Sequence, residues 1–392
     1  MVAMSNDAGW PGPGYPTPGY PQGYPPPGYP PPGYPPPGYG PPGYAPPGYP
    51  PPGFQPGFQP GFQHGGGVLK PGVIPLRPLA LSDIFNGAVN YIRRNPKATL
   101  GLTAIVVVVA QVISLILQIF GPLIATGEID PTLQGESASV GDIAVLSGSS
   151  LAGSITTAVA SVVLSGMLTV IVGRAVFGAD ITIGEAWQRV KSRVLALLGF
   201  TLLETLAVIL VIAIVVVAIV AVNAIGGGVA AFLVGAPLVI GAVALVSFVA
   251  TSLLFAPALI VLERLGIVDA ARRSFTLVKK DFWRVLGIWL LAALAAAVIA
   301  GAVGVPFSFG GGLLSSAANS GGAAVAGLVL IAVGGAIGQI LTAPFSAGVV
   351  VLLYTDRRIR AEAFDLVLRT GAAAGPGVPA HSTDHLWLIR HP

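Results

Sequence analysis

The stretch VLALLGFTLLETLAVILVIAIVVVAIVAV occupies residues 194–222 and contains one ionisable residue, Glu204. A helix needs about 20 consecutive apolar residues to cross the hydrocarbon of a bilayer, and this stretch is longer than that. Only 9% of the chain is charged and its mean hydropathy is +0.80, whereas soluble domains carry about 25% charged residues. The sequence therefore indicates an integral membrane protein.

Apolar runs long enough to cross a bilayer occur six times, which predicts an all-α membrane domain over residues 68–369. We expect six transmembrane helices at 98–120, 151–173, 194–222, 229–262, 285–305 and 323–354. The fourth and sixth runs exceed 30 residues and contain proline, so each must tilt, kink or break. A broken fourth run remains an open alternative to a kinked one.

The basic residues lie on one side of this topology. The loops at 121–150, 223–228 and 306–322 contain no Lys or Arg, so all 20 basic residues fall on the other side. Loops rich in Lys and Arg stay in the cytoplasm. We therefore expect a protein of the cell membrane with both termini cytoplasmic.

Basic clusters beside the spans predict contacts with anionic lipid headgroups. The candidate headgroup contacts are Arg93, Arg94, Lys97, Lys191, Arg193, Lys279, Lys280 and Arg284. These residues are spread over separate loops that adjoin the membrane, so their charge does not predict nucleic-acid binding.

Three segments on the basic side share the order acid, basic cluster, glycine. The acids are Asp83, Glu185 and Asp269, and apolar residues at helical spacing predict an amphipathic interfacial helix around each. Thr182 and Glu185 have the spacing of a capping box. We interpret the domain as three repeated units, each an interfacial helix followed by a two-span hairpin. The alternative is convergence, because interfacial helices in general share this pattern.

Residues 1–67 form a tail rich in Pro, Gly and Tyr, with a repeat that reads Tyr-Pro-Pro-Pro-Gly where it is most regular. The tail lacks the aliphatic residues needed for a core, so we expect it to be disordered. Two interpretations stay open: an inert spacer, or a multivalent binder of proline-recognising partners or of itself. Residues 370–392 are also expected to be a disordered end.

Three segments resemble a known family: RPLALSDIFNGAVNYIRRNP at 77–96, ERLGIVDAARRSFTLVKKDFWRVLG at 263–287 and LLYTDRRIRAEAFDLVLR at 352–369. They are similar to the six-span membrane domain first described beside glycerophosphoryl diester phosphodiesterases. They also resemble actinobacterial proline- and glycine-rich transmembrane proteins that share this domain. The resemblance implies the six-span fold. It implies no activity, because the family has no settled one for this domain alone.

The residues needed for familiar catalytic chemistry are missing from the expected membrane domain. The chain has no cysteine, which excludes disulfides, thiol catalysis and cysteine-ligated metals. Its four histidines, at positions 64, 381, 385 and 391, lie outside the expected spans. No Ser-His-Asp arrangement and no metal site is therefore predicted, and we expect a protein that is not an enzyme and has no cofactor.

Glu204 is the one acid inside an expected span, and such an acid commonly marks a transport or proton path. The alternative is a structural hydrogen bond to Gln111, Gln118 or Gln339 on another span. Two functions remain open. One is a membrane scaffold or accessory protein that binds partners or anionic lipid, and the other is a transporter or lipid-handling protein with a path near Glu204. The sequence does not indicate an oligomeric state.

Overall fold

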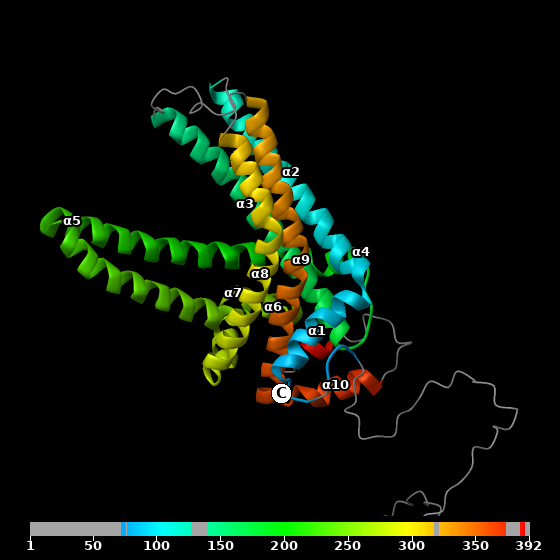
Figure 1. Ribbon diagram of the computed structural model, residues 1–392. Helices are drawn as coiled ribbons and strands as arrows, with labels where there is room; N and C mark the ends of the chain where they lie inside the picture. Colours follow the sequence, from blue (N-terminus) through cyan, green and yellow to red (C-terminus); the bar gives the residue numbers. More distant parts are fainter. Residues whose placement is uncertain (1–71, 76, 127–139, 317–320, 374–384, 389–392) are drawn as a thin grey trace, which may run out of the picture. The chain divides into compact units, whose positions relative to one another are not determined.

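The structure is a computed structural model of the chain, and it describes residues 72–75, 77–126, 140–316, 321–373 and 385–388. The chain divides into two units, Met1–Phe62 and Gln63–Pro392, and the described residues all belong to the second. The expectations for the tail of residues 1–67 lie outside the described residues. Within the described part the secondary structure is helical and includes no strand (Figure 1), which confirms the all-α class.

Five helical stretches are long and apolar enough to cross a membrane, as expected for an integral membrane protein. They are Lys97–Ala125, Ile143–Val176, Val194–Leu262, Phe282–Ser316 and Gly322–Glu362. The corresponding elements are η1 (Lys97–Gly101), a π-helix, α2 (Leu102–Thr126), α3 (Val140–Val176), α5 (Val194–Leu253), α6 (Ala256–Leu262), α8 (Phe282–Ser316) and α9 (Gly321–Glu362). Each of the five stretches contains the apolar core of a predicted run, and the stretch formed by α5 and α6 contains two such cores.

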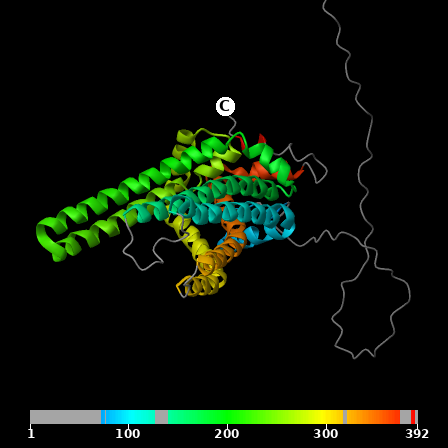
Figure 2. The same cartoon turned by 90° about the horizontal axis from the view of Figure 1, so that it is seen from above.

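A backbone break divides α5 into two arms. Gly227 has φ 71° and ψ −176°, a conformation that is essentially restricted to glycine. The break falls within the predicted connection 223–228, and the two arms lie side by side (Figure 2). The second arm ends at Leu253, where a turn separates it from α6. The predicted fourth run is therefore broken near its end rather than only kinked.

Three short amphipathic helices form where the sequence pattern predicts them. They are α1 (Leu81–Arg94), α4 (Ile183–Val190) and α7 (Ile267–Lys279), and each carries an acid in its first turn. The predicted capping box is present in α4, since the Glu185 N–H donates to Thr182 Oγ1 at 3.3 Å and the Thr182 N–H donates to Glu185 Oε2 at 2.9 Å. That the three helices are copies of one repeated unit remains a prediction.

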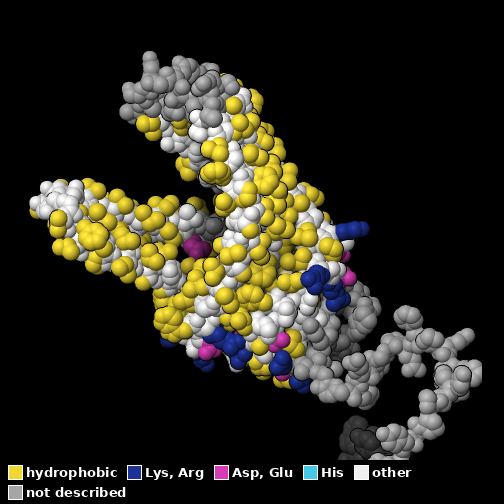
Figure 3. All heavy atoms as spheres, in the orientation of Figure 1, with side chains coloured by type: hydrophobic (Ala, Val, Ile, Leu, Met, Phe, Trp, Pro, Cys, Tyr) yellow, Lys and Arg dark blue, Asp and Glu magenta, His cyan; other side chains and the backbone are white. Residues whose placement is uncertain are grey.

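The most completely buried side chains gather where these short helices meet the last turns of α9. Leu259 and Ile260 of α6 and Tyr354 of α9 are fully buried there. We call this region the basic end and define it as α1, α4, α6, α7 and residues 350–369. Lys and Arg side chains collect around it, whereas hydrophobic side chains cover the long helices (Figure 3).

Helices α8 and α9 pack closely along much of their length. A Cβ atom on Gly327 would lie 2.5 Å from the carbonyl oxygen of Gly311, so both positions need a residue without a side chain. Small residues of this kind let membrane helices approach each other closely.

Candidate functional site

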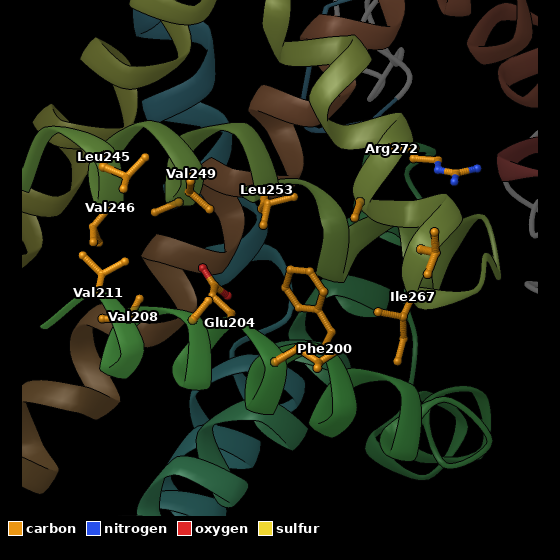
Figure 4. A pocket seen from close by; sticks show the side chains of 15 residues that line it. Phe200, Glu204, Val208, Val211, Leu245, Val246, Val249, Leu253, Ile267 and Arg272 are labelled. Atoms are coloured by element: carbon orange, nitrogen blue, oxygen red, sulfur yellow. The ribbon is translucent and has the colours of Figure 1, made fainter. Parts of the chain in front are cut away.

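The candidate site is a groove beside Glu204. Glu204 lies on the first arm of α5, and its carboxylate points toward Val249 and Leu253 on the second arm (Figure 4). The groove has a volume of about 410 Å³. Its lining residues come from both arms and from α7: Phe200, Leu203, Glu204, Ala207, Val208, Val211, Leu245, Val246, Val249, Ala250, Leu253, Ile267, Val268, Ala271 and Arg272. Glu204 and Arg272 are the only charged residues among them.

The structure does not provide Glu204 with the glutamine partner considered from the sequence. Gln339 donates to Ser161 Oγ at 3.1 Å, and Gln118 donates to Ser114 Oγ at 2.9 Å. Arg272 lines the same groove, but its guanidinium points away from Glu204 (Figure 4). Within the described residues, Glu204 therefore makes no hydrogen bond and no ion pair.

This arrangement favours a ligand with an apolar body and a polar group. The apolar walls can accommodate hydrocarbon, and the carboxyl can accept a hydrogen bond or pair with a cation. Glu204 has no oppositely charged partner among the described residues, and an unpaired charge beside apolar walls is costly.

The eight basic residues predicted as headgroup contacts do not form one site. Five of them, Arg93, Lys97, Lys191, Lys279 and Lys280, have exposed side chains and make no ion pair within the described part of the chain. Arg193, the N-cap residue of α5, is partly buried. Arg94 donates to the carbonyl of Gly178 and lies 3.4 Å from Asp180, so its charge is already paired.

Arg284 makes contacts within the protein that the sequence analysis did not predict. Its Nη2 donates to the carbonyl oxygen of Leu79 at 2.8 Å and lies 3.4 Å from Asp356 Oδ2. Asp356 is fully buried and also accepts from the Leu79 N–H at 2.8 Å and from Arg360 Nε at 2.9 Å. Arg284 therefore joins α8 to α9 and to the segment before α1, because a buried carboxylate needs a positive partner, and its own side chain remains 37% exposed.

Sequence reasoning also missed an ion-pair network around Glu263, directly after α6. The Glu263 side chain is fully buried, and it lies 2.6 Å from Arg273 Nε and 3.5 Å from Arg358 Nη1. Tyr354 donates its hydroxyl to Glu263 Oε1 at 2.6 Å. Burial alone would lower the pKa of Arg273, but the hydrogen bond to Glu263 and the negative charges of Glu263 and Glu362 together outweigh burial and raise that pKa.

The C-terminal segment differs from the expected disordered end of residues 370–392. Within it, residues 370–373 form the end of α10 (Phe364–Ala373), and residues 385–388 are also described. Trp387 is buried, with its ring centroid 5.2 Å from that of Phe364 and 5.5 Å from that of Phe177. The Trp387 carbonyl accepts a hydrogen bond from Arg358 Nη1 at 3.2 Å. The sequence signal was the run LWLI at 386–389, which follows a segment of small residues and a short polar stretch.

Fold and groove together define an all-α membrane protein with a largely apolar groove between the two arms of α5. The chain belongs to a family described as a domain of unknown function, DUF7847, which matches residues 79–357. No curated protein and no solved structure matches the chain.

Proposed function

We propose that the protein binds a lipid or a lipid-like amphipathic molecule in the groove beside Glu204, and that it acts in lipid handling or transport. The observation that supports this proposal is the carboxyl of Glu204, which has no partner among the described residues. It lies in a groove of about 410 Å³ whose only other charged residue is Arg272, on the α7 side. Ligand pockets of this type bury an apolar body and fix it through few polar groups.

The groove provides two polar contacts for such a molecule. Arg272 on α7 can pair with a phosphate or carboxylate, and Glu204 can pair with an amine or accept from a hydroxyl. Because the guanidinium of Arg272 points away from Glu204 (Figure 4), the two residues contact different polar groups of the molecule, with hydrocarbon between them.

The test is the amount of lipid that stays bound when the full-length protein is purified and exchanged into lipid nanodiscs. Glu204→Gln is expected to reduce the bound amphiphile, measured by mass spectrometry, about tenfold, because a hydrogen bond to a charged group is lost. Thr205→Val is the matched control, since Thr205 is adjacent, exposed and outside the groove. Equal lipid retention in both variants, with unchanged thermal stability, would contradict the proposal.

We propose further that the protein crosses the cell membrane six times, with both termini cytoplasmic and three repeated units. The two arms of α5 on either side of Gly227 supply two of these crossings, and the resemblance to the membrane domain found beside glycerophosphoryl diester phosphodiesterases has the same number. A reporter enzyme that is active only outside the cytoplasm, inserted after Asn223, should be active. The same reporter inserted after Lys280 should be silent.

A second candidate, a non-enzymatic scaffold or accessory protein, is favoured by the exposed basic side chains around the basic end. Arg93, Lys97, Lys191, Lys279 and Lys280 are available to anionic lipid or to a protein partner. The tail of residues 1–67 is proposed to contribute further protein contacts. Deleting residues 1–67 should leave membrane insertion intact and remove a stoichiometric partner from the purified complex. Unchanged partner composition would count against the scaffold.

A further inference from the structure

A second cavity, separate from the groove beside Glu204, lies between α3, α6 and α9. Its volume is about 320 Å³, and small-molecule sites commonly occupy about 300–1,000 Å³. Polar side chains line it from two sides: Ser161, Ser165 and Thr169 on α3, and Gln339 and Ser346 on α9. None of the residues that line the cavity carries a charge.

The polar residues form two facing rows. Ser161, Ser165 and Thr169 are spaced by four residues, and this spacing places them on one face of α3. Gln339 and Ser346 are seven residues apart, which is about two helical turns of α9. Gln339 Nε2 donates to Ser161 Oγ at 3.1 Å, so the two rows meet at one end of the cavity.

Polar groups in this cavity retain unused hydrogen-bonding capacity. Thr169 Oγ1 donates to the carbonyl of Ser165 at 2.8 Å. The hydroxyls of Ser165 and Ser346, in contrast, have no hydrogen-bond partner within the described residues. Ser165 is exposed and Ser346 is partly buried, so both hydroxyls are accessible, and a hydroxyl without a partner favours water or a ligand beside it.

The turn between α5 and α6 forms another part of the wall. Leu254 and Pro257 line the cavity. On the other side of this turn, Ser274 of α7 donates its hydroxyl to the carbonyl of Ser252 at 2.8 Å and accepts from the Phe255 N–H at 3.2 Å. Leu254 and Phe255 keep right-handed helical dihedral angles, so the turn interrupts the hydrogen bonds of the helix without reversing the chain. Interrupted helices commonly form the binding sites of transporters.

We propose that this cavity is a hydrated binding site for a small uncharged molecule that carries several hydroxyl or amide groups. Hydroxyl and amide side chains both donate and accept, and they match a neutral polar ligand without a counter-charge. The site is distinct from the groove beside Glu204, because the two share no lining residue. Even the neighbours Leu253 and Leu254 divide between them, with Leu253 in the groove and Leu254 in this cavity.

The absence of native cysteine permits a direct test of hydration with single-cysteine variants of the full-length protein in membrane vesicles. Ser165→Cys and Ser346→Cys should react with a charged, membrane-impermeant methanethiosulfonate at least about tenfold faster than Val159→Cys, because only a hydrated thiol ionises to the reactive thiolate. Val159 is the control, since it lies on α3 with a 41% exposed apolar side chain. Labelling after denaturation normalises the amount of each variant. Equally slow reaction of all three would overturn the proposal.

Protection experiments then test the ligand class. Erythritol, sorbitol and urea are the neutral probes, and choline and inorganic phosphate are the charged ones at equal concentration. Neutral probes should slow the labelling of Ser165→Cys, and charged probes should not. Adding Gln339→Leu should abolish this protection, whereas adding Gln111→Leu, which changes a glutamine outside the cavity, should preserve it. Rapid labelling without protection by a neutral probe would overturn the binding site and leave only a hydrated cavity.

Discussion

The basic end and the α5 arms are stabilised in opposite ways. At the basic end, side chains such as Leu259 and Tyr354 are fully buried, and buried charges are paired across helices. Along α5, large apolar side chains are mostly exposed, with Leu210 at 61% and Val217 at 67%. The chain itself therefore provides the environment of the basic end. The environment of α5 must come from lipid or from another molecule.

This difference indicates where function and stability reside. A region that pairs all its buried charges internally acts as a frame, and changes there are expected to lower stability. A region whose apolar surface is covered by lipid or by another molecule can change its conformation when that covering molecule changes. The groove beside Glu204 lies in that second region, next to α7 of the frame.

The largest effect is expected from Glu263→Gln at the basic end. This change leaves Arg273 and Arg358 beside a neutral group, and breaking a buried charge network commonly costs about 3–5 kcal/mol. The free energy of unfolding in detergent, followed by intrinsic fluorescence, should fall by about that amount.

Asp365→Asn is the matched control for this change. Asp365 lies 3.9 Å from Arg369, whose side chain is 58% exposed, and such surface pairs contribute about 0–1 kcal/mol. Similar losses for Glu263→Gln and Asp365→Asn would show that the buried network does not act as a frame.

A pair of leucine substitutions compares the two regions directly. Leu259→Ala removes a fully buried side chain of α6 and should cost about 2–5 kcal/mol, because it leaves a cavity. Leu210→Ala on α5 should change stability by less than about 0.5 kcal/mol, as expected for an exposed position. The measurement is thermal unfolding in nanodiscs. A large loss for Leu210→Ala would show that α5 is covered by another protein surface, such as a second copy of the chain.

The smallest effect concerns the capping box of α4. A hydrogen bond from the Thr182 backbone N–H lowers the pKa of Glu185 below its ordinary value of 4.5. A carboxyl with a lowered folded-state pKa stabilises the protein above its unfolded pKa, and this contribution is lost as the pH falls through the folded pKa. Glu185→Gln should therefore lower the melting temperature at pH 7 but not near pH 3. The loss should stay below about 1 kcal/mol, because Glu185 is exposed. An equal difference at both pH values would exclude the charge as the cause.

The features that could be predicted from the sequence depend on neighbours in the chain. The apolar runs, the amphipathic helices and the capping box of α4 arise from spacings of a few residues, which are visible without a structure. The connection predicted at 223–228 from the lengths of the apolar runs likewise contains the break at Gly227.

The missed features depend on residues that are distant in the chain. Arg284 was assigned to lipid headgroups because its partner, Asp356, lies 72 residues away. Glu263 and Tyr354 are separated by 91 residues, and no local pattern marks them as a pair. The polar row on α3 was visible only as a high content of Ser and Thr, and its meaning depends on Gln339 of α9 facing it.

The hydrogen bond from the Leu79 N–H to Asp356 Oδ1 spans 277 residues. Ribosomes add about 5–20 residues each second, so Asp356 is synthesised on the order of 15–55 s after Leu79. The donors to the Leu79 carbonyl, Arg284 and Arg360, are also synthesised much later than Leu79. During synthesis, the segment before α1 therefore lacks these partners until α8 and α9 have been made. The basic end can close only after α9 has been completed.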